Sequence, residues 1–314
     1  MKKKLKLYLN LSFIALLLLG VFSLSLRLFY GDLTESLDFY NWHQTNNKTI
    51  WIKQIRPETE LSYFETVGKG AIKNKQFLNK DGQPNNAKPA NSQNIPILMY
   101  HYISRAPATT TLAGLYLDPT IFANQLKEIK AADYNSFFVS EIAQSLKEGK
   151  ALPPKSLALT FDDGYADFYT QAWPLLKKYN LKSTLYVIIN DLDKPGYIKS
   201  SELKELAGSG LVEIGSHTFN HPDLRTLTAR QTNYEINLSR QALARLSGQP
   251  ILSFAYPFGL YTYQDLRVVV ESAYLAAVST NPGAEQSPSS LFVLNRLRPG
   301  GRQGNDFIAW LKAW

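Results

Sequence analysis

The chain has 314 residues, 45% of them hydrophobic, and no cysteine. Disulfides and thiolate chemistry are therefore excluded, and the length suffices for an α/β barrel, which commonly needs about 200 residues or more. The formal net charge of +8 falls to +3 without the first 27 residues, which hold five basic side chains and no acid. Since no basic stripe with interleaved aromatics accompanies the motifs below, no nucleic-acid partner is expected.

Residues 1–28 predict a basic cytoplasmic end followed by a membrane segment. Lysines at positions 2, 3, 4 and 6 precede an uncharged stretch from Leu7 to Leu26. As a helix this stretch would span about 30 Å, the thickness of a bilayer core, and the lysines place the N-terminus inside. We expect a single-pass anchor in the cell membrane, with the rest extracellular. A cleaved signal peptide, which would leave the protein secreted, is the alternative, although no small-x-small cleavage site follows.

Residues 29–94 are predicted to form an extracellular stalk and linker. Scattered apolar positions such as Trp51 and Phe64 allow one or two helices in the stalk. Residues 79–94 are rich in Asn, Gln, Pro, Lys and Gly, the composition of a flexible linker. We therefore expect the main folded domain to occupy residues 95–314.

From residue 95 onward, strand-like and helix-like runs alternate. Strands are predicted at 97–100, 136–139, 157–161, 184–189, 212–215, 252–256, 276–279 and 292–297. Helices are predicted at 121–131, 166–179, 201–207, 229–247, 263–273 and 305–314. Thr228 and Gln231 form a capping box at the start of the fourth helix. Repeated β/α units predict an α/β fold with a parallel sheet.

An acidic motif follows the predicted strand 157–161. Asp162, Asp163 and Gly164 separate this strand from the helix 166–179. Reactive groups of β/α folds gather where strands end and loops begin. The alternative is an ordinary strand-to-turn junction, where carboxylates and glycine are common.

A histidine motif follows the predicted strand 212–215. In Ser216-His-Thr-Phe-Asn-His221, the next residue, Pro222, biases His221 away from the helical region, so both imidazoles lie on a strand end and its turn. Solvent-exposed loop histidines are the alternative, but the whole chain has only four histidines.

Together the two motifs are sufficient for metal-assisted hydrolysis. Asp163, His217 and His221 offer one oxygen and two nitrogens to a divalent metal, and Asp162 is the natural general base. Zinc is the default, while cobalt, nickel and iron suit the same ligands.

A third string, Ala255-Tyr-Pro-Phe-Gly259, follows the acidic and histidine motifs. In this order the three strings resemble the first three motifs of the polysaccharide deacetylases, carbohydrate esterase family four. The resemblance covers residues 95–300. The run from Ile95 to Ile103 is similar to the opening strand of the biofilm branch, which deacetylates poly-N-acetylglucosamine. The resemblance implies a distorted (β/α) barrel of about seven units. It also implies a metal-dependent N-deacetylase acting on an extracellular N-acetylated polysaccharide, with Asp162 as base and Asp163 as ligand.

The chain departs from the family pattern at two positions. The usual acid is a histidine in a late Leu-x-His motif, but no histidine follows His221. His101, at the end of the first predicted strand, is therefore our candidate acid; a buried structural histidine is the alternative. The arginine that often orients the catalytic aspartate is replaced by Ala255, and Arg296 or Arg298 on the last predicted strand are candidates for that role.

Aromatic residues near the motifs are candidates for sugar binding. We expect Tyr165, Tyr256 and Phe258 to stack on pyranose rings, while Tyr261 is as compatible with ordinary packing. The resemblance also implies that a backbone N–H near Phe258 helps to bind the developing oxyanion. Three other functions stay open: peptidoglycan N-deacetylase, O-acetyl esterase, and a surface glycan-binding module without turnover.

Overall fold

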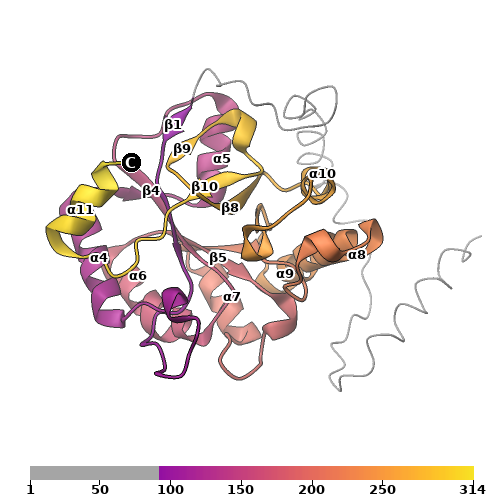
Figure 1. The fold of residues 1–314 in the computed structure, drawn as a ribbon, viewed down its shortest axis with the longest axis horizontal. Helices are drawn as coiled ribbons and strands as arrows, with labels where there is room; N and C mark the ends of the chain where they lie inside the picture. Colours follow the sequence, from indigo (N-terminus) through magenta and orange to yellow (C-terminus); the bar gives the residue numbers. More distant parts are fainter. Residues whose placement is uncertain (1–91) are drawn as a thin grey trace, which may run out of the picture. The chain divides into compact units, whose positions relative to one another are not determined.

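The computed structural model describes residues 92–314 (Figure 1). None of the helices between residues 92 and 314 has the length and apolar character that a membrane span requires. The predicted anchor at 1–28 and most of the predicted stalk and linker lie outside the described residues. The last residues of the predicted linker belong to the folded domain, since β1 (Gln93–Asn94) pairs antiparallel with β9 (Glu285–Gln286).

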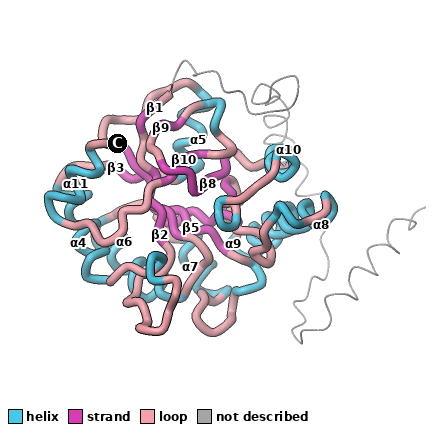
Figure 2. Tube along the Cα trace, viewed as in Figure 1, coloured by secondary structure: helices cyan, strands magenta, loops and turns pink. Residues whose placement is uncertain are grey.

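Seven parallel strands curl into a nearly closed barrel (Figures 1 and 2). They are β2 (Ile97–Tyr100), β4 (Ser156–Phe161), β5 (Ser183–Val187), β6 (Val212–Ser216), β7 (Ser253–Ala255), β8 (Ala276–Pro282) and β10 (Leu294–Arg296). Their order in the sheet is β10-β8-β7-β6-β5-β4-β2. Leu297 joins the two ends, because its carbonyl accepts from Met99 N and its amide donates to Ile97 O, each at 2.8 Å. The predicted barrel is confirmed.

Helices lie outside the strands (Figure 2). They are α4 (Pro119–Ala131), α5 (Val139–Glu148), α6 (Trp173–Tyr179), α7 (Ser200–Gly208), α8 (Ala229–Asn233), α9 (Ser239–Ser247), α10 (Tyr263–Glu271) and α11 (Gly304–Lys312). The helix predicted at 166–179 begins as the π-helical segment Phe168–Ala172 before α6. The helix predicted at 229–247 comprises α8, the π-helical segment Tyr234–Leu238 and α9. The capping box of Thr228 and Gln231 is confirmed.

The strand predicted at 136–139 is wrong beyond Ser136. Only β3 (Asn135–Ser136) pairs with β4, and Val139 begins α5, a helix that the sequence pattern did not reveal. A short apolar run does not distinguish a strand from a buried helix start. Here the Glu141 carboxylate accepts from Phe138 N at 2.8 Å, and Thr184 Oγ1 accepts from Val139 N at 3.1 Å, which satisfies amides at the helix start.

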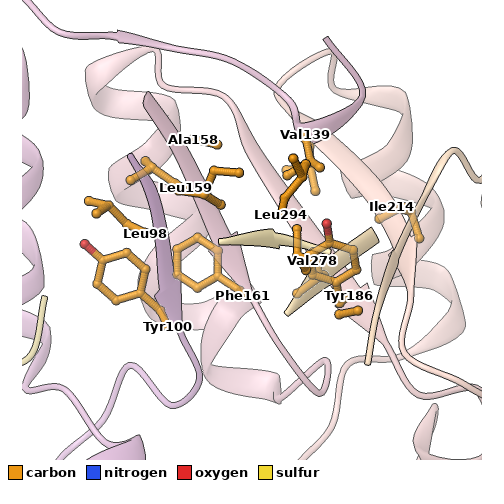
Figure 3. Packing of buried hydrophobic residues seen from close by; sticks show 14 of the residues in the cluster. Leu98, Tyr100, Val139, Ala158, Leu159, Phe161, Tyr186, Ile214, Val278 and Leu294 are labelled. Atoms are coloured by element: carbon orange, nitrogen blue, oxygen red, sulfur yellow. The ribbon is translucent and has the colours of Figure 1, made fainter. Parts of the chain in front are cut away.

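Buried side chains of the strands and the helices pack together in one hydrophobic core (Figure 3). All six residues of β4 are buried, as expected for a parallel strand that is covered on both faces. The rings of Tyr100 and Phe161, from neighbouring strands, stack with centroids 5.2 Å apart. Because the seven strands run in one direction, their carboxyl ends meet at one end of the barrel, where the motifs gather.

Candidate active site

The acidic motif forms a tight left-handed turn after β4. Asp163 has φ 73° and Gly164 has φ 77°, conformations that aspartate tolerates better than most residues and glycine adopts freely. Asp162 and Asp163 are 3% and 7% exposed, so the turn directs two carboxylates into a nearly dry site. Burying such charges requires partners, and each carboxylate has a different set.

The histidine motif is a curled loop after β6. Thr218 and His221 have φ values of 69° and 57°, and Thr218 Oγ1 accepts from His221 N at 2.8 Å. Left-handed backbone at residues other than glycine costs of the order of 1 to 3 kcal/mol each, so surrounding contacts must hold it. The curl brings His217 Nε2 and His221 Nε2 to 3.2 Å from each other.

The three predicted ligands converge on one point. Asp163 Oδ1 lies 3.3 Å from His217 Nε2 and 3.5 Å from His221 Nε2. The Ala255 carbonyl lies 2.8 Å from His217 Nδ1, which places the proton on Nδ1 and leaves the Nε2 lone pair directed at the other two ligands. Among the described residues, these three form a group able to hold a metal ion.

The arrangement fits a divalent ion. Asp163 Oδ1 is buried without a hydrogen-bond partner in the described part of the chain, which is costly unless a cation satisfies it. An ion about 2.0 to 2.2 Å from each ligand, at tetrahedral angles, would set the ligand atoms about 3.4 Å apart. Burial and then the neighbouring His217 lower the pKa of His221 to about 4, so its ring is neutral and available at neutral pH.

Asp162 is paired with a fully buried arginine. Arg296 Nη1 donates to Asp162 Oδ1 at 2.7 Å and Nη2 donates to Asp162 Oδ2 at 2.8 Å. Arg296 Nε donates to Ser279 O, and Nη1 also donates to Thr160 Oγ1. Burial by itself would raise the pKa of Asp162, but Arg296, assisted by His101, holds it well below its usual range. Of the two arginines expected near this carboxylate, Arg296 makes the pair, and Arg298 is exposed.

His101 lies beside the same carboxylate. Its Nε2 is 3.8 Å from Asp162 Oδ2, and its side chain is 12% exposed. Burial lowers the pKa of His101, while the charges of Asp162 and Asp163 oppose that change. The structure therefore brings the candidate acid next to the candidate base, at the end of β2.

Phe258 is an exposed aromatic residue in contact with His221. Its side chain is 58% exposed, and its ring meets that of His221 edge-on, with centroids 4.6 Å apart. Phe258 and Gly259 both have left-handed backbone, and a Cβ on Gly259 would lie 1.9 Å from Thr280 Oγ1. Glycine is thus required there for two reasons, and the turn presents Phe258 to solvent.

The two predicted tyrosines differ in exposure. Tyr165 is partly exposed, and its ring stacks on that of Tyr102 with centroids 3.6 Å apart. Tyr256 is fully buried, and its hydroxyl donates to Phe292 O at 3.1 Å. The prediction that Tyr256 stacks on a sugar is wrong, because the ring has no surface to offer; it supports Tyr261, whose ring lies 4.5 Å away.

Some contacts at the site were missed from the sequence. Thr160 and Ser279 hold the Arg296 guanidinium, and Glu235 binds the histidine loop. The role of Thr160 could have been suspected from the sequence, because it is a polar residue inside an apolar strand. The roles of Ser279 and Glu235 could not be predicted in this way, since their partners lie at least 15 positions away in the chain.

Comparisons with known proteins agree with this geometry. A family model described as polysaccharide deacetylase matches residues 149–277. YxkH of Bacillus subtilis, which is assigned to the polysaccharide deacetylases, is 31% identical over 227 residues, covering 72% of this chain and 78% of that protein. A Streptococcus pyogenes deacetylase, PplD, solved with acetate, is 31% identical with a TM-score of 0.65, covering 70% of this chain and 98% of that one.

A Staphylococcus aureus enzyme, poly-beta-1,6-N-acetyl-D-glucosamine N-deacetylase, is 26% identical over 189 residues. The match covers 56% of this chain and 65% of that enzyme, so the chain spans just under two thirds of its length.

Proposed function

This chain belongs to the polysaccharide deacetylase family, hydrolases that act on carbon–nitrogen bonds, and from that premise we propose that it hydrolyses acetamido groups of extracellular poly-N-acetylglucosamine to free amines and acetate. The convergence of three metal-binding side chains with Asp162, Arg296 and His101 at one end of the barrel carries the proposal. The similarity to the staphylococcal enzyme supports the choice of polymer.

Asp163, His217 and His221 would hold the divalent ion. When bound, such an ion polarises the acetyl carbonyl and makes a nearby water more acidic. The geometry suits zinc, cobalt, nickel or iron, because two imidazoles and one carboxylate are ligands for each. The Ala255 carbonyl fixes the orientation of His217, as partners of metal-binding histidines generally do.

Asp162 serves as general base. Arg296 keeps its carboxylate ionised and oriented, and a carboxylate has about four lone-pair sites, so two hydrogen bonds from Arg296 leave capacity to accept a proton from water. His101 serves as general acid and gives a proton to the departing amine. The two side chains lie 3.8 Å apart, too far for a direct hydrogen bond, so the proton on Asp162 returns to His101 by way of solvent, which restores both groups.

Phe258 and Tyr165 supply apolar surface for pyranose faces. Phe258 is the stronger candidate because it is largely exposed beside His221. Both lie in turns that follow strands of the barrel, so a polymer laid across the strand ends would contact them. The retention of the full set of ligands and base argues against a glycan-binding module without turnover.

We also propose that residues 1–28 anchor the enzyme in the cell membrane with its catalytic domain outside. The supporting observations are the cluster of lysines and the uncharged stretch that follows it. Extracellular placement suits a polymer too large to enter the cell.

The function is tested by acetate release from oligomers of β-1,6-linked N-acetylglucosamine, using the full-length chain in detergent. We expect equal amounts of acetate and primary amine, loss of release on chelation, and recovery when a divalent metal is returned. Asp162→Asn should abolish turnover, and His101→Asn should lower kcat by about 10²- to 10⁴-fold, the usual contribution of general acid catalysis.

Peptidoglycan and an O-acetylated polymer serve as parallel substrates. Release from peptidoglycan alone would reassign the substrate, and release from the ester alone would make the chain an O-acetyl esterase. No release from any of the three with zinc, cobalt, nickel or iron would refute the proposal.

A further inference from the structure

The loop that carries both histidine ligands needs external support. Thr218, a β-branched residue, and His221 both have left-handed backbone, and within the turn His221 N donates to Thr218 Oγ1. A strained loop relaxes unless its surroundings determine it. The convergence of His217 and His221 therefore depends on contacts that neighbouring elements make with this loop.

Glu235 supplies three of these contacts. Its Oε2 accepts from Phe219 N at 2.9 Å and Asn220 N at 2.8 Å, and its Oε1 accepts from Asn220 Nδ2 at 2.7 Å. The side chain is 6% exposed. Hydrogen bonds to an ionised acceptor are among the strong ones, and all three act on the two residues between Thr218 and His221.

The backbone around Glu235 is specialised for this contact. Glu235 lies in the π-helical segment Tyr234–Leu238 between α8 and α9 (Figure 1), and such segments often occur at functional sites. The Ile236 carbonyl accepts from Ser239 Oγ and from Tyr274 OH, each at 3.0 Å. Ser239 Oγ also lies 2.7 Å from Ser216 Oγ, directly before His217. The same helical run thus binds the loop at its start and at its middle.

We propose that Glu235 is a positioning residue for the metal ligands. Its carboxylate holds residues 219 and 220 so that His217 and His221 point at Asp163, and it thereby raises the affinity for the divalent ion and fixes the ligand geometry. The inference rests on the proposed function only in requiring an ion at these three ligands. It requires no particular polysaccharide.

The chain offers a matched control in Glu213. This carboxylate is also 6% exposed, and its Oε1 accepts from Thr184 Oγ1 at 3.1 Å and Ser253 Oγ at 3.0 Å. Glu213 lies within β6, four residues before His217, and its partners are Thr184 and Ser253 on the neighbouring strands β5 and β7 and Ser140 at the start of α5. Replacing it removes a buried carboxylate of equal exposure without removing a contact of residues 219 and 220.

The experiment compares Glu235→Ala, Glu235→Gln, Glu213→Ala and Glu213→Gln in the full-length chain. Affinity for Zn²⁺ and Co²⁺ is measured by competition with a chelator, and the visible spectrum of the Co²⁺ form reports the ligand geometry. We expect Glu235→Ala to raise the metal Kd by about 10- to 100-fold and to alter the Co²⁺ spectrum, as loss of a supporting residue typically does. Glu235→Gln keeps one acceptor oxygen and should weaken binding by several-fold.

The control variants should lower Tm while leaving the metal Kd and the Co²⁺ spectrum as in the unaltered chain. If Glu235→Ala does not fold, Glu235→Gln decides alone. A metal Kd within twofold of the unaltered chain in the folded Glu235 variants, or an equal loss of affinity in the Glu213 variants, would overturn the proposal. Weakened metal binding in an enzyme that releases no acetate would leave this inference standing and remove only the proposed function.

Discussion

Asp162 is a buried charge whose chemistry depends on a residue 134 positions away in the chain, Arg296. The bidentate pair does two things at once: it compensates the cost of burying both charges, and it keeps the carboxylate ionised beside His101. The pair matters more for the state and orientation of Asp162 than for stability, because a buried pair gains little over a well-packed apolar core.

Arg296→Gln should lower kcat while the metal Kd stays unchanged, since Arg296 contacts Asp162 and not the ligands. The pKa of Asp162 will rise, so the acidic limb of kcat/KM should move to higher pH. Removing one partner of a buried pair should also destabilise the fold by about 3 to 5 kcal/mol. Arg298→Gln is the control, and an equal fall in kcat there would show that general positive charge, and not the Arg296 pair, is what matters.

The sign of the pH effect on stability follows from the same pair. The pKa of Asp162 is lower in the folded protein than the value of about 3.9 in an unfolded chain. The pair therefore stabilises the fold fully above that unfolded value, and the contribution is lost as the pH falls through the folded pKa. As the pH falls below 5, the free energy of unfolding measured with urea should decrease less in Arg296→Gln than in the unaltered chain.

At the scale of elements, the turn after β7 decides how Phe258 meets solvent. Gly259 and Gly248, the latter at the end of α9, have nearly the same φ, 72° and 73°. A Cβ on Gly248 would contact nothing within 4 Å, whereas one on Gly259 would overlap Thr280. Alanine substitutions at the two glycines therefore distinguish the cost of backbone strain, which both share, from the cost of steric overlap, which only Gly259 has.

Gly248→Ala should cost roughly 1 to 2 kcal/mol, from left-handed backbone alone. Gly259→Ala should cost about 1 to 3 kcal/mol more, the usual penalty of overpacking, and should raise KM by displacing Phe258. Denaturant unfolding and steady-state kinetics on the same samples measure both effects. Equal losses of stability in the two variants, with unchanged KM, would show that the Thr280 contact does not position this turn.

For the whole molecule, Leu297 bridges the two ends of the nearly closed barrel, and the three proposed metal ligands come from the turns that follow two of its strands, β4 and β6. An ion bound there would connect loops that are 54 positions apart, between Asp163 and His217. Because an ion that binds only the folded state stabilises it by mass action, metal content and global stability should be coupled.

Removal of metal with a chelator should therefore lower Tm. At an ion concentration of 100 times Kd the stabilisation is about 2.7 kcal/mol, or roughly 5 to 10 °C for a domain of this size. The shift should disappear in Asp163→Asn and persist in Glu213→Gln, as followed by circular dichroism. A Tm independent of added ion in the unaltered chain would exclude a resident metal at this site.

The local chemistry could be predicted from the sequence: the Asp162–Asp163 turn, the His217–His221 loop and most of the alternating strands and helices. These features depend on neighbours a few positions apart, so spacing and apolar pattern suffice to predict them. The anchor at 1–28 is likewise a local pattern and stays a prediction.

Contacts between groups far apart in the chain could not be predicted and became visible in the fold. Arg296 and not Arg298 reaches Asp162, Tyr256 is buried and not available to sugar, and Glu235 binds the histidine loop. Each outcome depends on strand register and on how a helix packs, which join residues far apart in the chain. The hydrophobic periodicity of the sequence cannot predict such contacts. It indicates which face of a helix or strand is buried, but not which side chain of another element packs against that face.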